Sequence, residues 1–252
     1  MTEHVSIEKH GNTQIIRINR PDKKNALTDA MYHGITDAFY AGEEDSEIRA
    51  HILTGTDGIF TAGNDIADFN ERSQSDEKRS GSGVERYLIG QFEWNKPVIA
   101  AVDGLAVGIG TTLLFHCDLV YASERAQFIT PFAGLGLTPE NASSLVFPRA
   151  IGHQRAYELL CLGVPFSAEK AMQAGFVNEV VSAEELEAHA LKIAARLAAQ
   201  PANALKESKK LLRASLGDIE AVIRHEMKVF NECLHSEDAR NALQAFLSKK
   251  SK

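Results

Sequence analysis

Two glycine-containing segments have the composition of turns that bring backbone N–H groups to a ligand. They cover residues 58–66 and 101–112, and each follows a predicted strand and leads toward a predicted helix. Glycine lets a backbone approach a ligand closely, and the first N–H groups of a helix are free and carry partial positive charge. Two such turns side by side would hold one developing oxyanion between two N–H groups. Each segment alone is also typical of a tight structural turn, and neither matches a dinucleotide or phosphate loop.

The sequence places few carboxylates where they could transfer a proton near these turns. Glu140 follows Pro139, and a carboxylate in an apolar surround can both accept and return a proton. A glutamate directly after a proline is also typical of the first turn of a helix, so both interpretations stand. Asp65 and Asp68 are rival carboxylates, and Asp65 has the position of a helix-start residue.

Other reactive side chains do not form a recognisable catalytic set. His116 and His153 are the two histidines near the glycine segments, and we interpret both as structural. No combination of serine, histidine and aspartate can be identified, so a nucleophilic mechanism is the weaker interpretation. The cysteines, at positions 117, 161 and 233, have no metal-ligand spacing, which predicts reduced thiols in the core of a cytoplasmic protein.

The elements that must position these segments follow from hydrophobic periodicity. Apolar residues at helical spacing predict a helix over residues 26–41 and several helices in the last third, the final one capped by Ser236. This change from strand–helix alternation to consecutive helices suggests an appended helical part. Residues 71–85 are polar, which predicts a surface loop or a lid that orders with ligand. Strands are predicted at residues 5–8, 13–18, 51–54, 98–102 and 119–122.

The bulk composition narrows the class of protein. The chain has 252 residues, of which 44% are hydrophobic and 24% charged, as is typical of a soluble globular protein. A net charge of −7 argues against binding to nucleic acid or to an anionic membrane surface. The first residues do not form a signal region, and no apolar run is long enough to cross a bilayer, so we expect a cytoplasmic enzyme.

Motifs along nearly the whole chain resemble, in the same order, those of the crotonase (enoyl-CoA hydratase/isomerase) superfamily. They include an opening motif, two oxyanion-hole segments, the strand and loop that follow, and the lead into C-terminal helices. The matching segments are residues 20–27, 60–65, 101–110, 117–123, 126–128, 134–140 and 166–181.

This resemblance implies an α/β fold in which a spiral of ββα repeats precedes a C-terminal helical trimerisation region. We expect residues 1–195 to form the core that binds a CoA thioester, and residues 196–252 to form the oligomerisation region. The implied assembly is a homotrimer or a dimer of trimers. The implied substrate is an acyl-CoA thioester, with no metal ion, no redox cofactor, and no nucleic-acid or membrane partner.

The resemblance also assigns roles to residues. The two oxyanion donors would be the backbone N–H groups of Asn64 and Ile109, and Glu140 would be the catalytic acid and base. The positions expected to contact CoA or the acyl group are Lys24, Ala26, Ala62, Gly63, Asp65, Ile66, Gly108 and Phe132.

Departures from the hydratases of this superfamily point to an isomerase. Hydratases carry two glutamates, which would fall at Thr112 and Phe132 here, and neither of these side chains can activate water. Glu140 instead resembles the glutamate in the Pro-Glu loop of the peroxisomal-type Δ3,Δ2-enoyl-CoA isomerases. We therefore expect a Δ3-to-Δ2 enoyl-CoA isomerase of fatty-acid or related CoA-thioester catabolism. The alternatives are a hydratase-like or aromatic-CoA-pathway isomerase of the same fold, or a non-catalytic acyl-CoA-binding protein.

Overall fold

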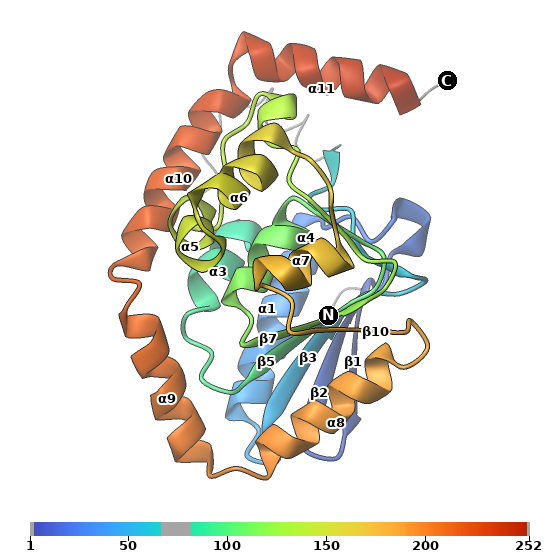
Figure 1. Ribbon diagram of the computed structural model, residues 1–252, viewed down its shortest axis with the longest axis vertical. Coiled ribbons are helices and arrows are strands. Elements are labelled where there is room, and N and C mark those ends of the chain that lie inside the picture. The colour runs from blue at the N-terminus through green and yellow to red at the C-terminus, as the bar shows by residue number, and fades with distance from the viewer. Residues whose placement is uncertain (1–2, 67–81, 251–252) are drawn as a thin grey trace.

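Two β-sheets and the helices around them make up the computed structural model, which describes residues 3–66 and 82–250 (Figure 1). The larger sheet has the strand order β1-β2-β3-β5-β7-β10, and the smaller has the order β4-β6-β8-β9. Neighbouring strands are parallel except for β1 with β2 and β8 with β9. The strands are β1 (Val5–His10), β2 (Thr13–Ile18), β3 (Ala50–Thr54), β4 (Ile59–Thr61), β5 (Val98–Val102), β6 (Leu105–Val107), β7 (Leu119–Ser123), β8 (Gln127–Ile129), β9 (Phe166–Ser167) and β10 (Glu179–Val181).

The central strands of the large sheet are apolar throughout because both of their faces are covered. In β5, Val98, Ala100 and Val102 belong to the main core, which includes α1 (Asp29–Glu44) and α3 (Gly83–Gly90). The intervening Ile99 and Ala101 face α8 (Leu186–Ala198) in a second core. This burial of both faces confirms the prediction that the continuous run at residues 98–102 is a two-sided strand.

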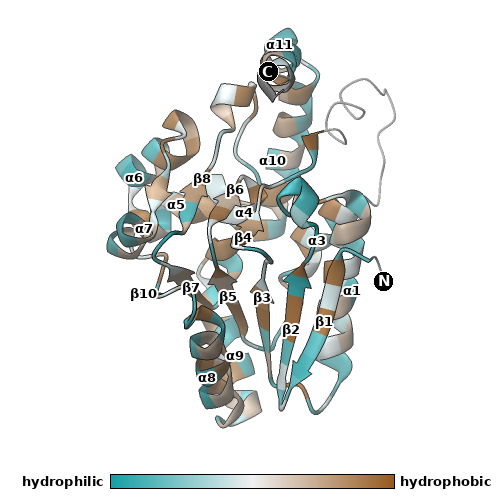
Figure 2. Cartoon of the chain, turned by 90° about the vertical axis from the view of Figure 1, so that its right-hand side faces the viewer, coloured by the Kyte–Doolittle hydropathy of each residue, from teal (hydrophilic) through white to brown (hydrophobic). Residues whose placement is uncertain are grey.

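The chain passes from the large sheet to the small sheet three times. β3 leads to β4, β5 leads to β6, and β7 leads to β8, and helical turns follow each pair. The small sheet lies beyond the ends of the large-sheet strands (Figure 2). This repeated passage is the predicted ββα spiral, and it places the segments after β4, β6 and β8 next to one another because those three strands are parallel neighbours.

Four helices follow β10. α8 covers the large sheet, and α9 (Ala202–Ala214), α10 (Ile219–Leu234) and α11 (Glu237–Lys250) continue along the rest of the molecule (Figure 1). The Ser236 hydroxyl accepts a hydrogen bond from Ala239 N at 3.1 Å, which confirms the predicted cap of α11. α11 packs closely on the loop before Glu140, since a Cβ on Gly136 would lie 2.7 Å from Ala239 Cα.

Two local predictions are wrong, and a third concerns residues that the structure describes only in part. The helix predicted from residue 26 begins at Asp29, because Thr28 is its N-cap: the backbone of Thr28 is extended, with φ of −94° and ψ of 165°, and its side chain accepts from Met31 N. The loop predicted for residues 71–85 ends earlier, since Ser82 caps α3; the rest of it, with Asp68, lies outside the described residues. Cys161 is exposed and is no core thiol.

The described helices include none with the length and apolar character needed to span a bilayer.

Candidate active site

Asn25 organises the approach to the first glycine turn. Its side chain is fully buried, and Nδ2 donates to the backbone oxygens of Thr56 at 3.2 Å and Ile59 at 2.7 Å. Its Oδ1 accepts from Arg20 N at 2.8 Å, and its backbone oxygen accepts from the Thr61 hydroxyl at 2.6 Å. Asparagine suits this position because its φ of 56° lies in the left-handed region that Asn tolerates better than most residues.

Replacing Asn25 by aspartate is expected to lower the free energy of unfolding by about 3 kcal/mol, because two donated hydrogen bonds become contacts between oxygens. Aspartate has nearly the same shape and backbone preference as asparagine, so the change in unfolding free energy measures the loss of these two hydrogen bonds. Urea denaturation measures it. Asn12→Asp is the control, because Asn12 Nδ2 donates to Glu47 O at an exposed site; a loss of similar size there would contradict the prediction.

The first oxyanion turn is held by backbone hydrogen bonds to residues 24–27. Ala62 N donates to Lys24 O at 2.9 Å, Leu27 N to Gly63 O at 2.8 Å, and Asp65 N to Leu27 O at 2.9 Å. Because Leu27 bonds to both neighbours of Asn64, the N–H of Asn64 points away from it. The segments predicted to bind CoA, around Lys24–Ala26 and 62–66, are therefore directly paired.

Side chains reinforce this turn. Arg20 pairs with Asp65 at 2.6 Å and also donates to Ala26 O at 3.1 Å, so Asp65 has a structural partner in this turn. The Tyr32 hydroxyl, from α1, donates to Asn64 Oδ1 at 2.5 Å. Asn64 is therefore held through its side chain, and its backbone N–H remains available.

The second turn lies directly against the first. A Cβ on Gly63, whose φ is +84°, would lie 2.6 Å from Val107 O, and one on Gly110 would lie 2.5 Å from Thr61 Cγ2. Only glycine permits this approach. Ile109 begins α4 (Ile109–Thr112), so its N–H belongs to the unpaired first turn of a helix.

Strand register brings the two predicted donors to equivalent positions. Thr61 pairs with Ala106 after an irregularity in β4, and Asn64 and Ile109 each lie three residues after this pair, beyond the ends of the strands. In the part of the chain that the structure describes, neither of these two N–H groups has a hydrogen-bond acceptor. The arrangement supplies two adjacent unused donors, as an oxyanion site requires.

Glu140 lies on a buried loop between η3 (Ala133–Leu135) and α5 (Ser143–Ile151). Its exposed fraction is 6%; Leu137 on the same loop is 6% exposed, and Phe132, directly before η3, is 5% exposed. The two residues that follow, Asn141 and Ala142, have φ of 60° and 54°. Ala142 is strained by roughly 1–2 kcal/mol in this conformation, whereas asparagine tolerates it better, and such strain gathers at functional sites.

Asn141 is fixed from two elements. Gln91, at the end of α3, donates from Nε2 to Asn141 Oδ1 at 2.6 Å. His116 Nε2 lies 2.7 Å from Asn141 O and donates to it. His116 ends η2 (Leu113–His116), which continues the helical segment that Ile109 begins. One helical segment therefore carries the predicted donor Ile109 at its start and an anchor for the Glu140 loop at its end.

Acid is expected to weaken the fold through His116. The pKa of His116 is lowered to about 4: burial lowers it most, the bond to Asn141 opposes this, and the nearby Arg213 adds to the lowering. Between pH 6.5 and 4 the unfolded chain therefore binds a proton that the folded chain does not, so stability falls as the pH falls.

At pH 4.5 this linkage is expected to remove about 2.5 kcal/mol of unfolding free energy relative to pH 7.5. Urea denaturation at both pH values measures it in the wild type and in His116→Gln, whose amide donates without titrating. The variant should lose about 2.5 kcal/mol less than the wild type. Equal losses would contradict the assignment, and exposed His10→Gln serves as the control.

Thr112 and Phe132, at the positions where a hydratase would carry glutamates, are both buried. Thr112 is fully buried, and its hydroxyl is 3.5 Å from Ile109 O; Phe132 is part of the main core. Neither supplies a proton-transfer group near the two turns.

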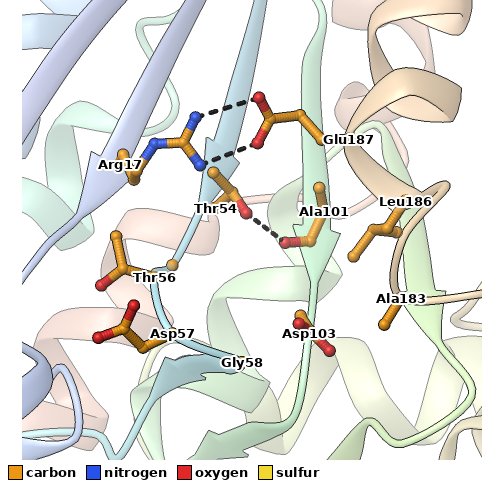
Figure 3. A pocket seen from close by; sticks show the side chains of 11 residues that line it. Arg17, Thr54, Thr56, Asp57, Gly58, Ala101, Asp103, Ala183, Leu186 and Glu187 are labelled. Atoms are coloured by element: carbon orange, nitrogen blue, oxygen red, sulfur yellow. Dashed lines mark hydrogen bonds and ion pairs between the residues drawn. The ribbon is translucent and has the colours of Figure 1, made fainter.

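A separate cavity of about 260 Å³ lies at the other end of the short strands, where Gly58 and Asp103 precede β4 and β6 (Figure 3). Most of its charged groups are paired: Arg17 forms two hydrogen bonds to Glu187 at 2.9 and 3.2 Å, and Asp103 accepts two from Arg125 at 2.6 and 2.7 Å. None of the predicted site residues lines it.

Sequence reasoning missed the residues that hold the site: Tyr32, Gln91, Arg213 and Glu226. Arg213, from α9, donates to the backbone oxygens of Gln91, Trp94 and His116 at 3.2–3.3 Å. Each of these four residues contacts a partner far away in the sequence, and no local motif predicts such a contact.

The two-sheet spiral with paired glycine turns is the crotonase fold, and comparisons with known proteins agree. A sequence model of the enoyl-CoA hydratase/isomerase family matches residues 8–252. The structure of OdaA from Pseudomonas aeruginosa has a TM-score of 0.92 and 44% identity, covering 97% of this chain and 99% of that one. The chain belongs to the enoyl-CoA hydratase/isomerase family, as its motifs predicted.

Relatives in the family have different activities in their names. Enoyl-CoA delta isomerase 2 of Homo sapiens is 38% identical over 94% of this chain, which spans only 61% of the human protein. The short-chain-enoyl-CoA hydratase of Clostridium acetobutylicum is 33% identical over 98% of this chain and 95% of its own length. Membership therefore establishes the enzyme family and leaves the reaction to be argued from the site.

Proposed function

We propose that this protein is an acyl-CoA double-bond isomerase that converts 3-enoyl-CoA to 2-enoyl-CoA. The distribution of carboxylates carries the proposal: Glu140 is buried on a loop that His116 anchors at the end of the helical segment that Ile109 begins, whereas Thr112 and Phe132 stand where hydratases carry glutamates. One carboxylate suffices when a proton leaves C2 and another returns at C4. Hydration requires both a group that activates water and a proton donor. The name of the human relative agrees with this proposal.

In the proposed reaction, the thioester oxygen accepts hydrogen bonds from Asn64 N–H and Ile109 N–H. The Glu140 carboxylate removes a proton from C2, and the C–H electrons form a dienolate whose negative charge rests on that oxygen. Protonated Glu140 then delivers the proton to C4, the double bond moves from C3–C4 to C2–C3, and the carboxylate is regenerated. Each N–H is expected to stabilise the transition state by roughly 3–4 kcal/mol.

Binding of the CoA part is proposed along the paired segments 24–26 and 62–66. Lys24 is exposed on a short helical turn beside the first oxyanion turn, where its ammonium group is free to approach a phosphate. Gly108, whose hypothetical Cβ meets nothing within 4 Å, leaves the space above the second turn open for the thioester.

The test is wild-type turnover of 3-enoyl-CoA compared with hydration of 2-enoyl-CoA at equal enzyme concentration. The proposal predicts that double-bond migration is the faster reaction. Faster hydration would favour the activity named for the Clostridium relative and would refute the proposal. An enzyme that binds the thioester but exchanges no deuterium at C2 would instead be a binding protein.

A further inference from the structure

The loop that carries Glu140 leads into a helix that has no local cap. Ala142 is the N-cap of α5, and alanine has no side-chain acceptor for the free N–H groups of the first turn. Ser143 N reaches Glu140 O at 3.1 Å, and Leu145 N and Val146 N reach Ala142 O. The N–H groups of Ala142 and Ser144 need an acceptor from elsewhere.

Glu226, on α10, supplies that acceptor. Its Oε1 accepts from Ser144 N at 2.9 Å and from the Ser144 hydroxyl at 2.5 Å, across 82 residues of sequence. The backbone N–H of Ala142 also donates to this carboxylate. Glu226 is only 6% exposed, so an ionisable side chain has been buried at the N-terminus of α5, where negative charge is stabilised.

The location of this cap connects it to the reacting carboxylate. Asn141 and Ala142, both left-handed, set the direction in which the chain leaves Glu140. Strained conformations of this kind persist only where the surroundings hold them on several sides. Gln91 and His116 hold Asn141 on one side, and Glu226 holds Ala142 and Ser144 on the other. Burial raises the pKa of Glu226, and the bonds from Ser144 and Ala142 oppose that shift.

We propose that Glu226 is a positioning residue: by capping α5 it fixes the backbone turn that holds the Glu140 carboxylate at the reacting carbons. The inference rests on the proposed isomerase function, because it assigns Glu140 the proton transfer. This role of Glu226 makes α10 a functional part of the site as well as a packing element.

The kinetic test compares Glu226→Leu, which removes every acceptor, with Glu226→Gln, whose amide oxygen still accepts from Ser144 N. We expect Glu226→Leu to lower kcat for 3-enoyl-CoA about 10- to 100-fold, because a misplaced base loses its geometry. KM should change by less than about twofold, because the base does not bind the ground state. Glu226→Gln should restore kcat to within about fivefold of wild type, since the cap is retained.

A control for stability alone is Lys209→Met. Lys209 is 7% exposed and pairs with Asp118 at 2.6 Å at the start of β7, so its loss weakens a buried ion pair away from the Glu140 loop. Its folded fraction should retain wild-type kcat. A kcat in Glu226→Leu that equals wild type, or that falls no further than in Lys209→Met, would overturn the proposal.

Hydrogen–deuterium exchange separates the cap from the reaction. Amides of residues 141–147 should exchange faster in Glu226→Leu than in wild type, and should be unchanged in Lys209→Met. If the amides exchange faster in Glu226→Leu but the wild type does not isomerise 3-enoyl-CoA, the capping role is supported and the proposed function is refuted. Unchanged exchange would refute the cap itself.

Discussion

Replacing Glu140 by glutamine is expected to lower kcat for double-bond migration by about 10²–10⁴-fold, the usual contribution of a positioned acid and base. Glutamine has almost the same shape, so the buried loop and its left-handed pair should persist. The thioester Kd should change by less than about threefold, because the oxyanion donors and the CoA-binding segments are untouched. Stopped assays with 3-enoyl-CoA, together with thioester binding by fluorescence or calorimetry, measure both quantities.

A matched control is Glu124→Gln, which neutralises an exposed carboxylate in the turn between β7 and β8. It should leave kcat within about twofold of wild type, as is usual for exposed positions away from a site. Deuterium exchange at C2 of a bound thioester should disappear in Glu140→Gln and persist in Glu124→Gln. Isomerisation or exchange that is indifferent to Glu140 would mean that another group takes the proton.

Gly108→Ala is expected to lower kcat by about 10²–10³-fold through loss of an oxyanion donor. Gly108 has φ of 57° and ψ of −117°, a conformation that residues with a Cβ avoid. An alanine would turn the peptide that carries Ile109 N–H, or project its methyl group into the open space of the site. Either change separates the donor from the position of the thioester oxygen.

Gly152→Ala provides the matched control. Gly152 also has positive φ, 80°, and open space at its Cβ position, but it joins α5 to α6 (His153–Tyr157) away from the turns. Both variants should lose about 1–2 kcal/mol of stability from backbone strain, and only Gly108→Ala should lose kcat. Equal kcat losses would show that strain, and not the N–H of Ile109, accounts for the effect.

The sheet core could be predicted because its signal is local. The run from Val98 to Val102 is apolar at every position, and each face meets a different core. The start of α1 was misplaced because Leu27 forms backbone hydrogen bonds to Gly63 and Asp65 and Thr28 is an extended N-cap, so neither residue belongs to the helix. Such contacts join residues more than thirty positions apart, for example Asn25 and Ile59, and they have no periodicity in the sequence.

The candidate site could be predicted only for its backbone donors and its base. The glycine segments and Glu140 were found from local composition and family resemblance, and their catalytic roles stay predictions. The supports could not be found, because Arg213 from α9 bonds to His116 and Glu226 from α10 bonds to Ser144, both through contacts between residues far apart in the sequence. The C-terminal residues, expected to mediate assembly, therefore also support this loop; trimer formation stays a prediction.

The two unused N–H groups lie just beyond the ends of the adjacent strands β4 and β6, so the spacing of those strands is the reference for an oxygen bound between them. Adjacent strands lie about 4.8 Å apart, and an oxygen about 2.9 Å from two nitrogens at that separation subtends an angle of about 110°. That angle is close to the separation of the lone pairs on a thioester enolate oxygen.

The irregularity in β4 decides which residue takes part. Ile59 pairs with Leu105, but Thr61 pairs with Ala106, so β4 contains one residue more than its neighbour over this stretch. Without the extra residue, Gly63 would stand beside Ile109, and its N–H is occupied by the Thr61 hydroxyl at 3.1 Å. A one-residue insertion in a three-residue strand thus decides that Asn64, and not Gly63, is the residue at the position equivalent to Ile109.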